Sequence, residues 1–246
     1  IFSTINSIGA TSLTSDDIII TEPTIIANQN MTISGNLIVL NSLSIINSTL
    51  CFNSTSTTLL FFKIESYVVI ENSDIFVSNG NYELVIDENA ERVEITDSNL
   101  YGFLAIVISS SRENVMINGS NIHNLNSGVT IYNAENVTLE GNHISSNMHG
   151  VLIQNSSYVT LTSNIIEMNT LYGLKSINSY NISVRSNVIQ ENQIGSYFIY
   201  SENITFSGNH ISENTERGGV FENSTNLIIK DNIFENNEIF GLNIYN

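Results

Sequence analysis

The sequence predicts an all-β protein, a parallel β-helix solenoid, on the strength of a repeat and an alternation. Residues 135–246 repeat one pattern five times, with a step of 22 or 23 residues between neighbouring repeats. Apolar residues alternate with polar ones within each repeat, as in Val137 and Leu139 or Ile204 and Phe206, which is the period of a β-strand and not of a helix. Leucine-rich repeats have a similar length, but their leucine framework is missing here. Since one repeat cannot bury its apolar face alone, we expect the repeats to stack into a single solenoid.

Asparagines and glycines recur at fixed places and mark the bends of the coil. Asparagine tolerates the left-handed conformation, glycine adopts it without steric penalty, and asparagines stacked about 4.8 Å apart can bond amide to amide in ladders. The first predicted ladder contains Asn142, Asn164, Asn187, Asn209 and Asn232, preceded at the same position by Ser98 and Ser120. The second contains Asn147, Asn169, Asn192, Asn214 and Asn237. The third contains Asn155, Asn178, Asn223 and Asn246, with Ser201 in its gap, and the glycine column contains Gly150, Gly173, Gly195, Gly218 and Gly241.

The chain divides into a short N-terminal segment and a solenoid of about ten coils. Residues 1–23 carry the only proline, Pro23, and are expected to lead into the solenoid and cap its first open edge. Residues 24–246 form the solenoid, with regular coils over 66–246, and the apolar stretch 59–70 predicts a buried strand. Because the chain stops at Asn246 without a capping segment, we expect the solenoid to continue, or to associate through its ends with another chain.

Composition argues against two kinds of partner. The 246 residues include 24 acidic and 7 basic ones, a formal net charge of −17, and form no basic stripe for nucleic-acid phosphates. There is no run of about 18 apolar residues, so we expect no membrane span in this segment. The first residues, IFSTINSIGA, do not read as a signal peptide, which we expect to have been removed or to lie outside this segment. The single cysteine, Cys51, is expected to be a small buried thiol.

The repeated pieces N-x-I-x-x-N and G-[VL]-x-[IF] carry a family resemblance. They resemble the right-handed parallel β-helix repeat of pectate-lyase-like proteins, in particular the NosD-like group described as a carbohydrate-binding and sugar-hydrolase domain. The match covers residues 66–246 well and 24–65 loosely. It implies a right-handed coil, an extracellular location and, often, a polysaccharide partner. The composition also resembles that of archaeal cell-surface proteins.

Sequons for N-linked glycosylation are frequent. Asn136, Asn181 and Asn203 share one position of the coil, just before an inward residue, which would place any sugars in a row. Two further sequons, at Asn155 and Asn223, fall on the third predicted ladder and are for that reason not counted as candidates. In a chain so rich in Asn, Ser and Thr, many sequons also arise by chance. The candidate glycosylation sites are Asn30, Asn47, Asn53, Asn118, Asn136, Asn181 and Asn203.

A column of glutamates marks the start of several coils, at Glu91, Glu113, Glu135 and Glu202. Stacked carboxylates about 5 Å apart repel one another when ionised, so the column requires a cation, an arginine or low pH. Ca²⁺ is a possible ligand because hard cations take oxygen ligands. The alternative is a solvated acidic face without a metal. We expect the histidines to be solvated, because His143 and His210 lie three coils apart and His123 and His149 have no partner at metal-ligand spacing.

Two sets of residues are candidates for ligand binding. Glu140, Arg185 and Lys230 fall in one outward column, and Tyr172, Tyr197 and Phe221 lie near the glycine column and could stack sugar rings. Chance placement and packing between coils are the competing interpretations. The resemblance implies that a lyase would use a Ca²⁺ carboxylate cluster with an arginine or lysine base, and a hydrolase two or three aspartates. Asp is scarce and no such set assembles, so no catalytic residue is assigned.

These observations favour a non-enzymatic, glycosylated extracellular protein, used as a surface layer, stalk, filament or adhesion module. The alternative is a polysaccharide-binding protein, or a lyase, hydrolase or epimerase of the pectate-lyase-like class. An outward cluster of acids with one base would discriminate the enzyme from the scaffold.

Overall fold

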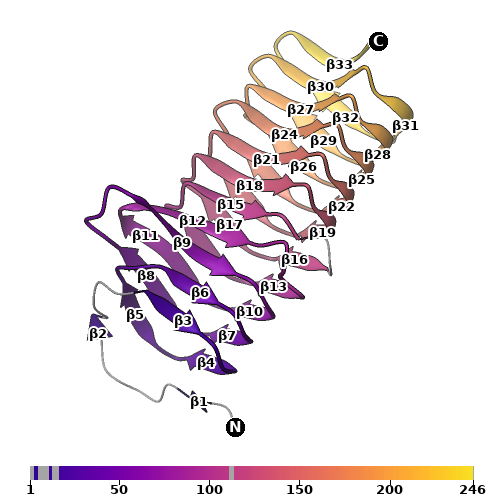
Figure 1. The fold of residues 1–246 in the computed structure, drawn as a ribbon. Coiled ribbons are helices and arrows are strands. Elements are labelled where there is room, and N and C mark those ends of the chain that lie inside the picture. The colour runs from indigo at the N-terminus through magenta and orange to yellow at the C-terminus, as the bar shows by residue number, and fades with distance from the viewer. Residues whose placement is uncertain (1–2, 5–10, 13–16, 111–113, 246) are drawn as a thin grey trace.

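A computed structural model describes the chain except for residues 1–2, 5–10, 13–16, 111–113 and 246. The chain winds into an elongated stack of coils, with the N-terminus at one end and the C-terminus at the other (Figure 1). Three parallel sheets run along the stack, and each contains 11 strands within the described residues. The prediction of an all-β parallel β-helix of about ten coils is confirmed. In the part of the chain that is described, no helix is long and apolar enough to cross a membrane.

Each coil contributes one strand to each sheet. Sheet A contains β1 (Ser3–Thr4), β4 (Thr24–Ala27), β7 (Leu43–Ile46), β10 (Val68–Glu71), β13 (Val93–Thr96), β16 (Val115–Asn118), β19 (Glu135–Glu140), β22 (Ser157–Thr162), β25 (Tyr180–Arg185), β28 (Glu202–Ser207) and β31 (Thr225–Lys230). Sheet B contains β2 (Thr11–Ser12), β5 (Asn30–Ile33), β8 (Thr49–Asn53), β11 (Asp74–Asn79), β14 (Asn99–Tyr101), β17 (Asn121–His123), β20 (His143–Ser145), β23 (Ile165–Glu167), β26 (Val188–Gln190), β29 (His210–Ser212) and β32 (Ile233–Glu235). Sheet C contains β3 (Ile18–Ile20), β6 (Leu37–Val39), β9 (Leu59–Ile64), β12 (Asn81–Ile86), β15 (Ala105–Ile108), β18 (Ser127–Tyr132), β21 (His149–Gln154), β24 (Tyr172–Ile177), β27 (Ile194–Ile199), β30 (Arg217–Glu222) and β33 (Phe240–Tyr245).

The alternation of the sequence sorts side chains into an apolar interior and polar outer faces. Inward residues such as Val137, Leu139 and Ile144 are fully buried. Aromatic residues fill the interior in places, as where Phe198 stacks on Phe221 with ring centroids 4.8 Å apart. The apolar stretch 59–70 is not one strand, because the turn at 65–67 divides it between β9 in sheet C and β10 in sheet A.

The first two asparagine ladders are confirmed at the corners of the coil. In the first, each side-chain amide from Asn142 to Asn209 donates to Oδ1 of the asparagine in the next coil at 3.0 Å. In the earlier coils the hydroxyls of Ser48, Ser73, Ser98 and Ser120 take over this position, each accepting a backbone N–H of the preceding coil at 3.1 Å. The second ladder has the same form, as where Asn169 Nδ2 donates to Asn192 Oδ1 at 3.0 Å. These bonds satisfy buried polar groups that would otherwise cost free energy.

The third ladder is made of serines, and the prediction of an asparagine ladder there is wrong. Buried hydroxyls accept backbone N–H groups of the preceding coil at 3.1–3.3 Å, and they belong to Ser156, Ser179, Ser201 and Ser224. The asparagines one place earlier, Asn155, Asn178 and Asn223, are exposed and left-handed, with φ between 46° and 51°. Tyr200 holds that place in the coil of Ser201, and Asn246 lies outside the described residues. Asparagine was taken for the ladder residue because it is also the best residue for the left-handed bend beside it.

The glycine column also has a different cause from the predicted one. Gly150, Gly173, Gly195 and Gly218 do not adopt the left-handed conformation. A Cβ at any of them would lie 2.5–2.7 Å from the carbonyl oxygen of the next glycine in the column. The column is therefore required by close approach of neighbouring coils, and not by a bend.

Cys51 differs from its prediction as a buried thiol. It lies half-exposed on sheet B, with Sγ 3.2 Å from Ser78 Oγ. Its column on the outer face continues into Phe76 and Tyr101, because the register pairs Cys51 with Phe76 and Phe76 with Tyr101.

Candidate functional site

The outward column of Glu140, Arg185 and Lys230 lies on sheet A. The strand register places Thr162 between Glu140 and Arg185, and Ser207 between Arg185 and Lys230. Arg185 donates to Ser183 Oγ at 2.9 Å and to Ser207 Oγ at 3.2 Å. The three charged residues share a column, but every second place in it is neutral and no ion pair joins them in the described chain.

The outer face of sheet C brings together a denser group of side chains from β21, β24, β27 and β30. The strand register forms three columns side by side across these strands. The first contains His149, Tyr172, Ile194 and Arg217; the second Leu152, Lys175, Tyr197 and Val220; and the third Gln154, Ile177, Ile199 and Glu222. We name the sheet C site by six of these residues, His149, Tyr172, Lys175, Tyr197, Arg217 and Glu222.

Aromatic rings stack along the sheet C site. The ring centroids of His149 and Tyr172 are 5.6 Å apart, and those of Tyr172 and Tyr197 are 5.8 Å apart, with interplanar angles of 23° and 15°. The predicted strip therefore exists for two of its three residues, whereas Phe221 is fully buried and packs on Phe198 and Phe206 in the interior. Since the rings cover one another's faces, the strip presents ring edges and hydroxyls outward, and not the open faces on which a sugar ring would stack.

Two basic residues belong to the sheet C site. Lys175 Nζ is 4.4 Å from the ring centroid of Tyr172 and 5.7 Å from that of Tyr197, a cation–π arrangement. Arg217 lies in the column of Tyr172, two coils further on, and its buried Nε has no hydrogen-bond partner among the described residues. Neither cation forms an ion pair with a carboxylate of the described chain.

The carboxylate of Glu222 accepts hydrogen bonds from two tyrosine hydroxyls. Its Oε2 accepts hydrogen bonds from the hydroxyls of Tyr197 and Tyr245. Burial, followed by the hydrogen bond to Glu222 and the charge of Glu222, raises the pKa of Tyr197 above its ordinary value. Burial and the positive charge of Lys175 lower the pKa of His149, whose buried Nδ1 has no partner in the described chain. At neutral pH the site therefore offers the neutral imidazole of His149 and the protonated phenol of Tyr197 beside the side chains of Lys175 and Arg217.

Sequence reasoning identified Tyr172 and Tyr197 and missed the other four residues of the sheet C site. The charged members were passed over because no local motif surrounds them. The signal that could have found Arg217 is its offset of 45 residues from Tyr172, which equals two coils. His149 was expected to be solvated, but it is stacked and partly buried.

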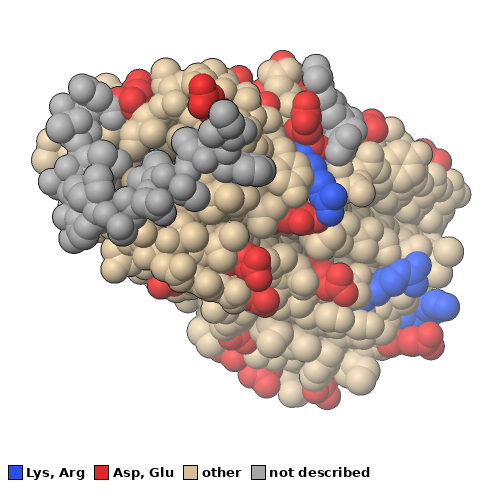
Figure 2. All heavy atoms as spheres, turned by 90° about the horizontal axis from the view of Figure 1, so that it is seen from below, with Lys and Arg blue, Asp and Glu red and all other residues tan. Residues whose placement is uncertain are grey.

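The remaining acids and histidines that the structure describes are not arranged as a metal centre. Within the described ranges, no three His, Cys, Asp or Glu side chains lie where they could hold one ion. Glu135 and Glu202 share a column, but Ser157 and Tyr180 lie between them, and Glu113 lies outside the described residues. The face shown in Figure 2 carries scattered acidic side chains and few basic ones.

Two of the histidines form pairs across neighbouring coils, and their side chains stay 42% and 40% exposed. His143 Nε2 lies 2.9 Å from Glu167 Oε1, and His210 Nε2 lies 2.7 Å from Glu235 Oε1. Each imidazole thus has a carboxylate partner on the outer face of sheet B.

The sequon asparagines of sheet A form a row. Asn136, Asn181 and Asn203 occupy one left-handed position, with φ of 54–56°, at a place where the strand register skips a residue. Tyr158 holds this position in the coil between Asn136 and Asn181. The candidate residues Asn30, Asn47 and Asn53 are exposed, and Asn118 is half-exposed. Since Asn155 and Asn223 are exposed and not ladder residues, the reason for setting their sequons aside is wrong.

The fold defines a parallel β-helix that displays side chains in columns on its outer sheets. The chain belongs to the right handed beta helix region family, whose model matches residues 43–200 and 104–246. No curated protein matches the sequence.

Several solved structures share the fold. The enzymatically active domain of tailspike protein 2 of bacteriophage CBA120 has a TM-score of 0.65 and 12% identity; the match covers 84% of this chain and 39% of that one. The A-module of mannuronan C-5 epimerase AlgE4 of Azotobacter vinelandii has a TM-score of 0.59 and 14% identity, covering 92% and 82% of the two chains. The periplasmic alginate epimerase AlgG has a TM-score of 0.59 and 15% identity, covering 93% and 76%. At these identities the likeness concerns the fold.

Proposed function

We propose that this protein is an extracellular, non-enzymatic module that binds an acidic polysaccharide at the sheet C site. The supporting observation is the placement of Lys175 and Arg217, without carboxylate partners, on one aromatic face of a protein whose net charge is −17. An anionic chain would be repelled by most of such a surface and attracted to this face. The similarity to proteins that act on mannuronan and alginate supports the same class of ligand.

The chemistry of the sheet C site suits a sugar carboxylate. Lys175 supplies a point charge and Arg217 a planar donor group, which together can bind carboxylates of neighbouring sugars. The hydroxyls of Tyr172 and Tyr197 can form hydrogen bonds with the hydroxyls of the sugar rings beside them. Glu222 accepts the Tyr197 hydroxyl and fixes the direction of that phenol.

His149 favours a second candidate function, an enzyme that acts on the acidic polysaccharide. An imidazole held neutral beside a cation can accept the proton next to a sugar carboxylate, whose charge Lys175 would stabilise. Return of a proton to the opposite face gives an epimer, whereas loss of the glycosidic oxygen gives chain cleavage and an unsaturated end. We rank this candidate second because, among the residues that the structure describes, no cluster of three His, Cys, Asp or Glu side chains includes His149.

The glycosylated-scaffold role remains part of the proposal. Sugars on Asn136, Asn181 and Asn203 would decorate sheet A and leave sheet C free. Self-association through the ends of the β-helix and a surface-layer, stalk or filament role stay predictions.

Binding of polymannuronate and polygalacturonate, measured by calorimetry at low and at physiological salt, tests the proposal. We expect Lys175→Met combined with Arg217→Met to weaken binding at least tenfold, with a smaller dependence on salt. Lys230→Met is the matched control, because Lys230 is exposed on sheet A, and it should change affinity less than twofold. Absence of binding to any acidic polysaccharide, or equal loss in the control, contradicts the proposal.

Product analysis of the same incubations separates the two candidates. Unsaturated ends, or solvent deuterium at the epimerised carbon, would establish the enzyme in place of the binding module. Their loss in His149→Gln, with binding retained, would assign the base to His149.

A further inference from the structure

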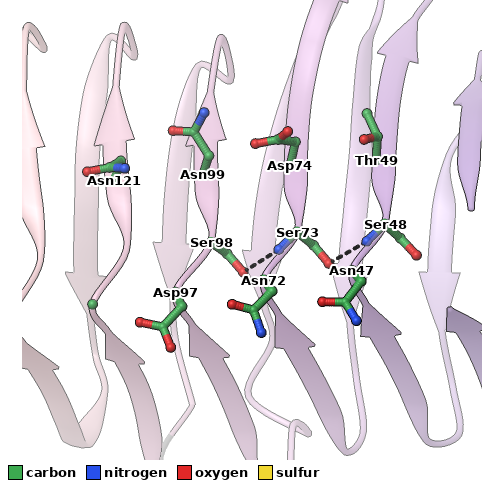
Figure 3. Close-up of a pocket in the computed structure, with 11 residues that line it drawn as sticks. Asn47, Ser48, Thr49, Asn72, Ser73, Asp74, Asp97, Ser98, Asn99 and Asn121 are labelled. Atoms are coloured by element: carbon green, nitrogen blue, oxygen red, sulfur yellow. Dashed lines mark hydrogen bonds between the residues drawn. The ribbon is translucent and has the colours of Figure 1, made fainter. Parts of the chain in front are cut away.

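A polar groove lies at the corner between sheets A and B, in the N-terminal half of the solenoid. Its volume is about 500 Å³. Figure 3 shows its side chains arranged in two rows along the axis, with a serine ladder between them. We call it the corner groove. Its lining residues are Asn47, Ser48, Thr49, Asn72, Ser73, Asp74, Asp97, Ser98, Asn99, Gly119 and Asn121.

The backbone fixes both rows. The first row, Asn47, Asn72 and Asp97, occupies the left-handed bend that ends the strand of sheet A, with φ of 46–47°. The second row, Thr49, Asp74, Asn99 and Asn121, is held in direct register at the start of sheet B. Between the rows, Ser48 and Ser73 are tied into the buried ladder by bonds of 3.1 Å (Figure 3). The groove is therefore rigid and formed in advance of any ligand.

Most side chains of the two rows are not used by the fold. Within the described residues, no side-chain hydrogen bond is formed by Asn47, Thr49, Asp74, Asp97 or Asn121. Two row residues are partly used, because Asn72 Nδ2 donates to Glu71 Oε1 at 3.4 Å and Asn99 Oδ1 lies 3.1 Å from His123 Nε2. Unpartnered amides, carboxylates and the Thr49 hydroxyl thus lie along the two rows.

The fold does not require this polarity. In the C-terminal half the same bend position is taken by Gly141, Ser163, Ser186 and Gly208. The same strand position becomes His143, Ile165, Val188 and His210. Amide and carboxylate side chains are therefore concentrated over one part of the columns, although coils of the same shape form without them.

We propose that the corner groove is a second binding site, which takes a neutral, hydroxyl-rich sugar chain laid along the solenoid axis. The free amides donate and accept bonds with sugar hydroxyls, and the carboxylates of Asp74 and Asp97 accept charge-assisted bonds from them. Coils repeat about every 4.8 Å, close to the advance of one ring in an extended sugar chain, so each coil can present one pair of side chains to each ring.

The charge of the groove separates it from the sheet C site. Its lining contains two carboxylates and no basic residue, so it disfavours the acidic chain that the sheet C site is proposed to bind. A column of stacked rings, Phe76, Tyr101 and His123, follows two residues further along the same strands, with centroids 4.8 and 5.0 Å apart. These rings form an apolar border beside the second row.

The test uses protein purified without N-glycosylation, because a glycan on Asn47 would fill the groove. Cellohexaose, maltohexaose, mannohexaose and chitohexaose are titrated by calorimetry in the presence of EDTA. We expect one of them to bind, and Asp74→Asn combined with Asp97→Asn to weaken that binding about tenfold. Asn has nearly the shape of Asp and tolerates the left-handed bend, so the fold should be retained, as checked by circular dichroism and thermal unfolding.

Asp231→Asn is the matched control, because Asp231 holds the position of Asp97 in a distant coil, with φ of 56°. It should leave affinity unchanged, as should Lys175→Met combined with Arg217→Met, which affects only the sheet C site. The proposal is overturned if none of the four oligosaccharides binds, if Asp231→Asn causes the same loss, or if binding appears only when Ca²⁺ replaces EDTA. None of these results bears on binding of acidic chains at sheet C.

Discussion

His149 illustrates how single residues in this protein depend on the coils beside them. In sequence it is a lone histidine near a glycine, without a partner at ligand spacing. In the folded chain it stacks on Tyr172, one coil away, and feels the charge of Lys175. Its pKa is lowered first by burial and then by that charge. The unfolded chain therefore binds more protons than the folded one just below pH 6.5, and the stabilising contribution of the neutral imidazole is full above that pH and falls on acidification.

Removal of the Lys175 charge should raise the pKa of His149 towards its ordinary value. The change is Lys175→Met, and the measurement is a titration of the imidazole by NMR. Lys230→Met should leave the titration where it is. An unchanged or lower pKa in Lys175→Met would show that the charge of Lys175 does not reach the ring.

Among the residues of the first ladder, Asn187 forms the most side-chain hydrogen bonds in the described chain. Its amide donates to Asn209 Oδ1, Leu161 O and Arg185 O, while its Oδ1 accepts from Asn164. Asn187→Ala would leave buried groups of two neighbouring coils unpaired, and we expect it to lower the free energy of unfolding by about 2 to 4 kcal/mol. Urea unfolding measures the change. Thr160→Ala, on the outer face of sheet A, should change the free energy of unfolding by no more than about 0.5 kcal/mol. A loss in Asn187→Ala no larger than this would contradict the role of the ladder in pairing buried polar groups.

At the scale of strands and turns, glycine has two separate uses. In the column of Gly150, Gly173, Gly195 and Gly218, the next coil lies too close for a Cβ. At Gly119, Gly141 and Gly208 the reason is a left-handed bend, with φ of 60–65°. The first use depends on the spacing between coils, whereas the second depends on one residue's own backbone.

These two uses predict that substitution lowers the free energy of unfolding by different amounts. Gly195→Ala should cost about 2 to 3 kcal/mol or more, because its Cβ would lie 2.6 Å from the carbonyl oxygen of Gly218. Gly208→Asn should cost less than about 1 kcal/mol, because Asn tolerates the bend and the nearest atom to a Cβ is 3.6 Å away. Thermal and urea unfolding of both variants measure these changes in the free energy of unfolding. Equal costs would contradict the distinction.

At the scale of the whole molecule, the solenoid separates its chemistry by face and by position along the axis. Sheet C carries the two cations and the stacked phenols, sheet A carries the row of sequon asparagines, and the corner of sheets A and B carries the polar groove. Contacts join each coil only to its neighbours, so side chains in one column can change without disturbing the next. One rigid rod can in this way present several surfaces to long, repetitive ligands.

The sequence by itself determined the fold class, the number of coils and the first two ladders. A repeat of 22 or 23 residues with strand-like alternation has few other solutions, and Asn142 or Asn147 could be placed in columns by counting alone. Counting also placed Glu140, Arg185 and Lys230 in one column. The repeat period can be counted along the chain, and for that reason it is visible in the sequence before the structure is known.

The tertiary structure alone decided which residue of each bend faces inward and which outward side chains meet. Ser156, and not Asn155, is the ladder residue, because a ladder residue and its left-handed neighbour differ by one position, and that shift moves a side chain from the interior to the surface. The same step buried Phe221 and left Tyr197 outside. The approach of Lys175 to the ring of Tyr197 and of Tyr197 to Glu222 depends on the register between coils, which is set only when the coils are stacked.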